Sequence, residues 1–168
     1  WILLQNETNA IADIIDKAHQ LGLHIAFNPA PMTESVKNLP LQKLSLLVVN
    51  EIEAEQLTGF SDIEKIKQTL LSSYPKTNFV VTLGKQGAWY INQDTAEFCE
   101  AFKVDAVDTT AAGDTFIGFF LAAYQRQESP EQALRYASAA SALAVTKAGA
   151  APSIPSVEEV QQFLKTHK

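Results

Sequence analysis

Residues 44–59 are Leu44-Ser45-Leu46-Leu47-Val48-Val49-Asn50-Glu51-Ile52-Glu53-Ala54-Glu55-Gln56-Leu57-Thr58-Gly59. The first six form an almost continuous apolar run, which is typical of a strand buried on both faces of a parallel sheet. The segment Glu51–Thr58 predicts a short helix, and Gly59 ends it. A buried strand that leads directly into a helix is the repeating unit of an α/β protein.

The same alternation of strand and helix extends through the rest of the chain. Four further strands are predicted, at Ile2–Gln5, His24–Phe27, Asn78–Leu83 and, as a hairpin neighbour of the last, Ala88–Asn92. Five further helices are predicted, after a candidate cap at Thr8 and before Gly22, after Ser61 or Asp62, and over Gly113–Tyr124, Pro130–Lys147 and Ser156–Lys165. We therefore expect a three-layer α/β fold, a mostly parallel sheet flanked by helices, in a single domain over residues 1–168.

Composition excludes several classes of protein. Of the 168 residues, 46 % are hydrophobic and 19 % are charged, as in ordinary globular proteins. Thirteen basic against nineteen acidic side chains give a net charge of −6, which argues against nucleic acid or an anionic membrane as the main partner. Cys99 is the single cysteine, so no disulfide can form within one chain, and we expect a cytoplasmic protein.

Residues 107–116 carry the most chemical information: Val107-Asp108-Thr109-Thr110-Ala111-Ala112-Gly113-Asp114-Thr115-Phe116. Small residues and Gly113 allow a tight turn whose N–H groups point into one space, directly before an apolar helix. Such a turn can stabilise negative charge on a transferred phosphoryl group. Asp114 can accept a proton from an attacking hydroxyl group. The residues alone leave open a second interpretation, in which Asp114 only caps the helix.

Other polar or glycine-containing segments follow the predicted strands, where ligands bind in parallel α/β sheets. Residues 82–87 contain two glycines that let a phosphate chain approach the backbone, although such a pattern is more often a simple turn. The sequence contains neither a Walker A loop nor a dinucleotide-binding fingerprint. Glu53 offers a carboxylate suited to Mg²⁺, or else it belongs to a solvated helix face with Glu51 and Glu55.

A small-residue segment, Ala144–Ser153, ends the second of the two long apolar helices. Carbonyl groups at a helix end can surround a weakly hydrated cation. Without further information, the same segment is simply the end of a helix.

The segment Asp108–Asp114 resembles the Asp-Thr-x-x-x-Gly-Asp signature of the ribokinase family of sugar kinases. Five further motifs occur in the ribokinase order and spacing, namely Leu3-Leu4-Gln5-Asn6-Glu7-Thr8, Asn28-Pro29-Ala30-Pro31, Asn50-Glu51-Ile52-Glu53-Ala54-Glu55, Thr82-Leu83-Gly84-Lys85-Gln86-Gly87 and Ala144–Ser153. The resemblance covers essentially the whole chain and implies a ribokinase-like fold truncated at its N-terminus. Ala111 and Ala112 stand where many relatives outside the ribokinases have glycine, which favours a ribokinase over a fructokinase or an adenosine kinase.

The resemblance implies ATP-dependent phosphorylation of D-ribose to ribose 5-phosphate. Asp114 would be the general base, and the backbone of Ala111, Ala112, Gly113 and Asp114 would form the anion hole. The implied ATP-binding residues are Asn50, Thr82, Leu83, Gly84, Lys85, Gln86, Gly87, Gly113 and Ser138, although Ser138 stands where ribokinases can carry histidine. Glu7 would contact the sugar together with Asp114. Glu53 would support Mg²⁺ from the outer shell. An activating K⁺ is assigned, mostly through backbone oxygens, to Asp108, Thr110, Ala144, Lys147, Gly149 and Ser153.

The resemblance also implies that a lid and most sugar contacts belong to a preceding N-terminal half, and that the full-length protein is a homodimer through this lid. Trp1-Ile2-Leu3-Leu4-Gln5 is no natural initiation sequence, so we expect the polypeptide to begin further upstream. We expect the 168 residues alone to be inactive or weakly active. Two alternatives stay open: a kinase for another sugar or a nucleoside, and a nucleotide-binding fragment without activity of its own.

Overall fold

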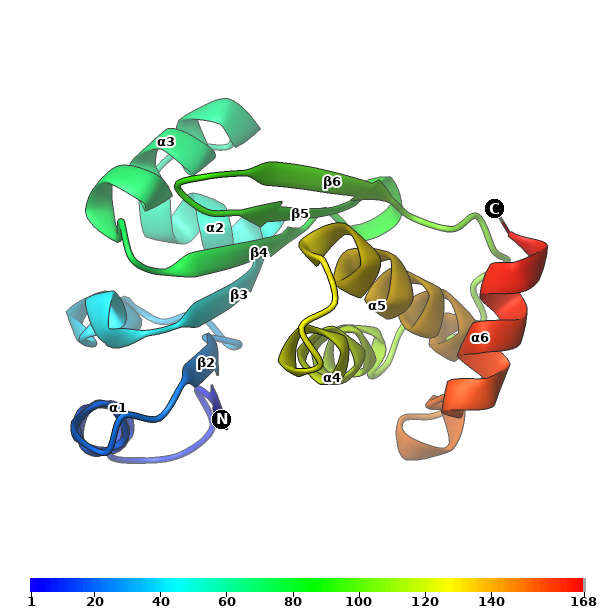
Figure 1. Ribbon diagram of the computed structural model, residues 1–168, viewed down its shortest axis with the longest axis horizontal. Helices are drawn as coiled ribbons and strands as arrows, with labels where there is room; N and C mark the ends of the chain where they lie inside the picture. The colour runs from blue at the N-terminus through cyan, green and yellow to red at the C-terminus, as the bar shows by residue number, and fades with distance from the viewer. Residues whose placement is uncertain (168) are drawn as a thin grey trace. The chain divides into compact units, whose positions relative to one another are not determined.

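The computed structural model describes residues 1–167, which contain six strands and six α-helices (Figure 1). The strands are β1 (Ile2–Gln5), β2 (Ile25–Asn28), β3 (Leu46–Asn50), β4 (Asn78–Thr82), β5 (Gly87–Ile91) and β6 (Ala96–Glu100). The helices are α1 (Ile11–Gln20), α2 (Glu51–Thr58), α3 (Ile63–Ser73), α4 (Ala112–Gln125), α5 (Pro130–Val145) and α6 (Val157–Thr166). Short 3-10 helices occupy Glu34–Asn38, Leu41–Lys43, Gly84–Gln86 and Ala151–Ser153.

The six strands form one sheet in the order β1-β2-β3-β4-β5-β6. Strands β1 to β4 pair in parallel, with Gln5 opposite Asn28 and Asn50 opposite Thr82. Because these four strands run in the same direction, their carboxyl ends lie at one edge of the sheet, where ligands bind in such folds. The expected α/β class with a mostly parallel sheet and accompanying helices is confirmed.

The chain divides into two compact units. Unit 1 comprises Trp1–Leu83 and Trp89–Ala96, and unit 2 comprises Gly84–Ala88 and Glu97–Lys168. The interpretation of residues 1–168 as a single domain stays a prediction. Among residues 1–167, no helix is both long enough and apolar enough to cross a membrane.

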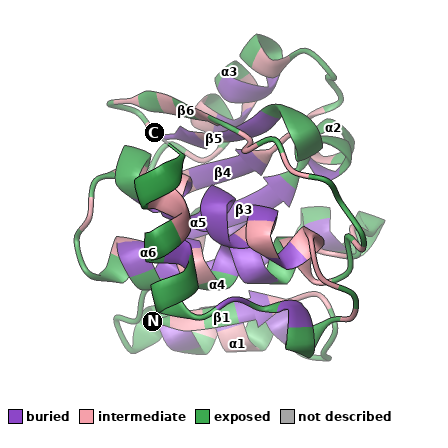
Figure 2. Cartoon of the chain, turned by 90° about the vertical axis from the view of Figure 1, so that its right-hand side faces the viewer, coloured by how far each residue is buried: buried purple, intermediate pink, exposed green. Residues whose placement is uncertain are grey.

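The core of unit 1 follows from the alternation of side chains along its strands, since every second residue points to the same face. Apolar side chains of β3, β4, α1 and α3 belong to one buried cluster, among them Leu47, Val49, Phe79, Val81, Ile15, Ile66 and Leu70. Figure 2 shows β3 and β4 as buried strands. This packing fixes the strand ends on which the polar residues of unit 1 stand.

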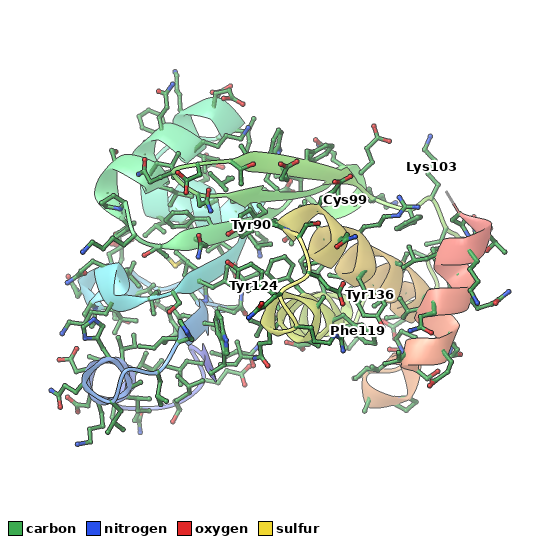
Figure 3. All side chains as sticks on the ribbon, viewed as in Figure 1. Tyr90, Cys99, Lys103, Phe119, Tyr124 and Tyr136 are labelled. Atoms are coloured by element: carbon green, nitrogen blue, oxygen red, sulfur yellow. The ribbon has the colours of Figure 1, made fainter. Side chains whose placement is uncertain are left out.

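Helices α4 and α5 pack against each other in unit 2. Alanines such as Ala137 and Ala140 are completely buried in α5, and their small side chains permit close approach of helices. Phe119 of α4 and Tyr136 of α5 place their ring centroids 5.4 Å apart (Figure 3). Ser129 caps α5 by accepting the N–H of Gln132 at 3.2 Å, which agrees with a proline at the first helical position.

Three local features bear on the sequence-based expectations. Thr8 does not cap α1, because the helix begins at Ile11 after Ala10, which has φ 61° and makes no side-chain cap. Strand β6 is not among the predicted elements. Its side chains alternate between exposed and half-buried positions, so its residues form no apolar run that would indicate a strand. The predicted cap at Asp62 is confirmed, because its Oδ1 accepts the N–H of Lys65 at 3.0 Å.

Candidate active site

The loop before α4 in unit 2 is held by backbone hydrogen bonds to the end of α5. The N–H groups of Val107 and Asp108 both donate to the carbonyl oxygen of Val145, at 2.8 and 3.1 Å. The Ser141 hydroxyl, also on α5, donates to the carbonyl oxygen of Ala112 at 3.1 Å. Helix α5 therefore fixes both ends of the segment that the sequence singles out as catalytic.

The Asp108 carboxylate joins this loop to the segment after α5. Its Oδ1 accepts the N–H of Thr110 and its Oδ2 accepts the N–H of Gly149, each at 2.9 Å. Hydrogen bonds from the side chain and backbone of Thr110, and from the backbone of Gly149, lower the pKa of Asp108 to about 2. The carboxylate is therefore ionised at neutral pH and already has hydrogen-bond donors on both oxygens.

The first turn of α4 has the geometry of an anion site. Ala111 precedes it as the N-cap residue in the left-handed conformation, with φ 60°, and the alanine side chain makes no cap hydrogen bond. The first amides of an α-helix have no acceptor within the helix itself and can bind an anion. Asp114 is exposed and lies in the first turn, after the N-cap position that Ala111 occupies. Asp114 is therefore not the N-cap residue of α4.

The protein atoms around Gly113 would leave room for a larger side chain at this position. Its φ is not in the left-handed region, and a Cβ added there would meet no atom within 4 Å. A glycine inside a helix is less stable than alanine by roughly 0.5–1 kcal/mol. The open space at Gly113 lies at the helix start, where a ligand can approach the backbone amides.

The segment 144–153, assigned to a cation, is anchored on two sides in addition to the Asp108–Gly149 bond. Lys147 Nζ lies 2.9 Å from Glu159 Oε1 at the start of α6, and Glu159 Oε2 also accepts the Ser156 N–H. Ser153 is completely buried, and its hydroxyl donates to the Ala150 carbonyl oxygen at 2.7 Å. These bonds place the candidate cation residues in one connected part of unit 2.

The Gly84–Gln86 turn and Gly87 have separate structural roles. Gly84 has φ 53°, and a Cβ added there would meet no atom within 4 Å, so the turn is open to an approaching ligand. Gly87 has φ 135°, and an added Cβ would lie 2.1 Å from the Cys99 carbonyl oxygen. Close contact with β6 therefore explains the glycine at position 87 without any ligand.

Ser138 lies in α5 and is only 7 % exposed. It forms a hydrogen bond with Cys99, and this bond opposes the effect of burial, which raises the pKa of the Cys99 thiol. A role of Ser138 in contacting adenine stays a prediction.

In unit 1, Asn50 and Glu53 form a reciprocal cap at the start of α2. Asn50 Oδ1 accepts the Glu53 N–H, and Glu53 Oε2 accepts the Asn50 N–H, each at 2.9 Å. Glu53 is only 6 % exposed, whereas Glu51 and Glu55 are exposed, so the interpretation of Glu53 as part of a solvated face is wrong. Burial raises the pKa of Glu53, and the hydrogen bond from Asn50 opposes this rise.

The remaining candidates of unit 1 stand at the same carboxyl edge of the parallel strands. Thr82 is the register partner of Asn50, and Leu83 follows it. Glu7 is exposed in the turn after β1, and Asn6 beside it donates to the Pro31 carbonyl oxygen at 2.7 Å. The structure thus brings Asn50 and Thr82 together, with Glu7 two strands away on the same edge.

Asn28 is a buried polar residue whose separate role is not evident from residue type alone. It ends β2, is 7 % exposed, and donates from Nδ2 to the Val48 carbonyl oxygen at 2.9 Å. This side-chain bond continues the link between β2 and β3 where the backbone register ends at Phe27 and Leu47. A polar residue directly after an apolar strand is the signal for it in the sequence.

A match to known proteins covers most of the chain. The family model described as pfkB family carbohydrate kinase matches residues 3–157. A ribokinase of Staphylococcus aureus is 41 % identical over 154 residues, which are 88 % of this chain and 49 % of that protein. A deoxyribokinase of Salmonella typhi is 31 % identical over 169 residues, or 98 % of this chain and 55 % of that protein. The chain thus spans about half the length of the curated relatives it matches.

Solved structures of sugar kinases also match nearly the whole of this chain. A ribokinase of Arabidopsis thaliana, complexed with ribose and ATP, superimposes with a TM-score of 0.87 at 31 % identity, covering 97 % of this chain and 55 % of that one. A structure described as an Escherichia coli ribokinase II in complex with ATP and Mg²⁺ has a TM-score of 0.82 at 25 % identity, covering 98 % of this chain and 58 % of that one. Fructokinases match as well, among them fructokinase-1 of Oryza sativa, which is 35 % identical over 72 % of this chain and 40 % of that protein.

Proposed function

Because the chain belongs to the pfkB family of carbohydrate kinases, we propose that it is the nucleotide-binding and catalytic part of an ATP-dependent ribokinase. The first turn of α4 carries this proposal. Gly113 leaves open space above the helix start, and Asp114 is exposed in the same turn. Phosphoryl transfer to an alcohol needs this combination of amide donors and an adjacent carboxylate.

In the proposed reaction, Asp114 accepts the proton of the sugar hydroxyl that attacks the terminal phosphoryl group of ATP. The oxygen of that hydroxyl forms a bond to phosphorus while the bond to the departing ADP breaks. The first-turn amides of α4, with the positive end of the helix dipole, stabilise the charge on the transferred group. The bonds from Val107 and Asp108 to Val145 keep this turn in place.

The proposed nucleotide-binding residues of unit 1 are Asn50, Thr82 and Leu83. Asn50 and Thr82 are neighbours across β3 and β4, and Glu7 would contact the sugar. No cluster of three His, Cys, Asp or Glu residues suited to a metal occurs within residues 1–167. Mg²⁺ in kinases is usually held largely by nucleotide phosphates and water, where it neutralises phosphate charge. Glu53 fits an outer-shell role, since its Oε2 is already bonded to the Asn50 N–H.

The proposed K⁺ site fits the backbone oxygens of the segment after α5 better than the Asp108 carboxylate. Both carboxylate oxygens of Asp108 accept N–H groups, so Asp108 would contribute through its carbonyl group. Ala144, Lys147 and Gly149 would likewise contribute carbonyl groups, and Ser153 its hydroxyl. A bound K⁺ would add positive charge behind the anion site.

A second candidate function is phosphorylation of a sugar other than ribose. The matches to a deoxyribokinase and a fructokinase favour it, because these similar proteins are named as kinases of other sugars. The same Asp114 and α4 geometry would serve either substrate.

The proposal is tested by joining this chain to the half of the Staphylococcus aureus ribokinase that it does not match, in the order of the relative. ATP consumption by this chimera is measured with ribose, deoxyribose and fructose, in K⁺ and in Na⁺. Ribose-dependent turnover that is faster in K⁺ supports the catalytic role proposed for this chain. The sugar preference of the chimera follows the grafted half, where most sugar contacts are expected, so the second candidate is tested by assaying the same three sugars with the natural full-length protein. ATP binding without turnover on any sugar would reduce the chain to a nucleotide-binding module. The unjoined chain is assayed in parallel and is expected to be inactive or weak.

A further inference from the structure

Ser141 in α5 donates a hydrogen bond that leaves its own helix. Its hydroxyl lies 3.1 Å from the carbonyl oxygen of Ala112, the first residue of α4. A serine in the middle of a helix more often faces solvent or bonds a carbonyl group one turn back in the same helix. Ser72 in α3 does the latter, since its hydroxyl donates to the Thr69 carbonyl oxygen at 3.0 Å. The Ser141 hydroxyl instead joins α5 to the start of α4.

The acceptor of this bond shares a peptide group with the N–H of Gly113. Because the peptide group is planar and trans, the Ala112 carbonyl and the Gly113 N–H point in opposite directions. At a helix start the carbonyl points along the helix, and the N–H points out of its N-terminal end. A donor that holds the Ala112 carbonyl oxygen therefore also fixes the direction of the Gly113 N–H.

The Gly113 N–H is a free donor at the start of α4. The preceding amide, that of Ala112, already donates to the Thr109 carbonyl oxygen at 3.2 Å. Within residues 1–167, by contrast, the Gly113 N–H has no acceptor. Gly113 is exposed, so a phosphoryl oxygen that approaches the helix start can reach this N–H.

The hydrogen bond from Ser141 also affects how strongly the Gly113 N–H donates. A bond accepted by a carbonyl oxygen polarises the peptide group in the direction that makes its N–H a better donor. In a regular helix the Ala112 carbonyl accepts one N–H from the next turn, and Ser141 adds a second donor. Preorganised donors of this kind stabilise charge that develops in a transition state, because they need no rearrangement during the reaction.

We propose that Ser141 is a positioning residue of the phosphoryl-transfer site, whose hydroxyl orients and polarises the Ala112–Gly113 peptide group so that the Gly113 N–H stabilises the transferred phosphoryl group. The inference rests on the proposed function, because it requires a phosphoryl group at the start of α4. An interaction that strengthens in the transition state contributes to kcat and not to ground-state binding. Its effect on stability is small, since alanine favours a helix more than serine does and so offsets the loss of one hydrogen bond.

The experiment compares Ser141→Ala, Ser141→Thr and Ser72→Ala in the natural full-length protein. Ser141→Ala should lower kcat about three- to tenfold, which is the effect of one neutral hydrogen bond. The KM for ATP and the unfolding temperature should stay close to those of the original protein. Ser141→Thr keeps a hydroxyl group and should return kcat to within about twofold of the original value. Ser72→Ala is the matched control, because it removes a hydroxyl bond within one helix, and it should keep full turnover.

Nuclear magnetic resonance tests the connection from Ser141 to Gly113 without catalysis. Isotope labels on alanine carbonyl carbons and glycine nitrogens select the Ala–Gly peptide groups, which occur in this chain only at 112–113 and 148–149. Loss of the hydrogen bond in Ser141→Ala should shift the Ala112 carbonyl and Gly113 nitrogen signals upfield. The signals of the peptide group at 148–149 should stay in place and serve as the internal control.

Several results would overturn the proposal. An unchanged kcat in Ser141→Ala, a loss confined to the KM for ATP, or an unchanged Gly113 signal would each do so. A fall in unfolding temperature that accompanies the fall in kcat would assign Ser141 to stability instead. A Ser141→Thr variant that restores the Gly113 signal but not turnover would also contradict it. Absence of turnover by the original full-length protein on every sugar would contradict the proposed function, whereas the Gly113 signal would still show whether Ser141 acts on this peptide group.

Discussion

The Asp108 carboxylate accepts the N–H of Gly149 at 2.9 Å and so joins two segments that are 41 residues apart in the sequence. One segment contains the proposed anion site and the other the proposed cation site. A single side chain thereby couples the backbone positions of both. A cation bound near Gly149 would influence the α4 turn through this connection.

The first prediction concerns the pH dependence of this connection. The folded-state pKa of Asp108 lies at about 2, below its ordinary value of 3.8, so its ionised form stabilises the fold above pH 4. This stabilisation is lost as the pH falls towards 2. Asp108→Asn should therefore unfold at a lower temperature than the original chain at pH 7, with a difference that shrinks between pH 4 and pH 2. Thermal unfolding across this pH range measures it.

Asp105→Asn is the matched control for this prediction, since Asp105 is exposed in the same loop. Its unfolding temperature should follow that of the original chain. A constant difference between Asp108→Asn and the original chain down to pH 2 would show that the carboxylate charge is not the cause.

The second prediction separates stability from catalysis at Gly113. An added Cβ meets no atom within 4 Å at either Gly113 or Gly118 of α4, so alanine at each position should raise stability by up to about 1 kcal/mol. In the chimera, Gly113→Ala should reduce kcat/KM about tenfold or more, because its methyl group would occupy the space proposed for the phosphoryl group. Gly118→Ala should keep normal turnover. Equal turnover in the two variants would show that catalysis does not need the open space at Gly113.

The third prediction concerns the cap of α2. Asn50→Ala removes the acceptor of the Glu53 N–H and should reduce the free energy of unfolding by roughly 0.5–2 kcal/mol. Asn50→Ser keeps an acceptor for that N–H and should restore most of the loss. Urea unfolding followed by circular dichroism measures both. If serine and alanine were equally destabilising, the cap would not be the source of the effect.

The fourth prediction tests the structural explanation of Gly87. An added Cβ would lie 2.1 Å from the Cys99 carbonyl oxygen, and φ is 135°. Gly87→Ala should therefore destabilise the chain by more than about 1 kcal/mol. A variant as stable as the original chain would contradict the close contact between Gly87 and β6.

The sequence is sufficient for the elements whose patterns are local. Residues 46–49 and 79–81 are continuous apolar runs, and the helix predicted at Glu51–Thr58 has the same bounds in the structure. Strand β6 could not be predicted in this way, because its residues form no apolar run and its pairing follows from the short turn after β5, where the Asn92 N–H donates to the Thr95 carbonyl oxygen. Residue type indicates which side chains can cap a helix, and Thr8 is one of them, whereas the actual start of α1 depends on the backbone at Ala10.

The site could be predicted only in part for the same reason. The signature residues Asp108, Gly113 and Asp114 are close in sequence, so their grouping is evident from it. The bond from Asp108 to Gly149 and the burial of Glu53 arise from packing that residue identities alone do not contain. The predicted lid and homodimer concern polypeptide that this chain does not include, and they stay predictions.

The central claim is that Asp114 removes the proton from the sugar hydroxyl at the start of α4. Its most direct test is ATP turnover by the chimera with Asp114→Asn, beside Asp105→Asn as a control of equal charge change. Because general-base catalysis contributes about 10²–10⁴-fold, Asp114→Asn should lose at least about a hundredfold in kcat while still binding ATP. Turnover within about tenfold of the original chimera would contradict the assignment of Asp114 as the base.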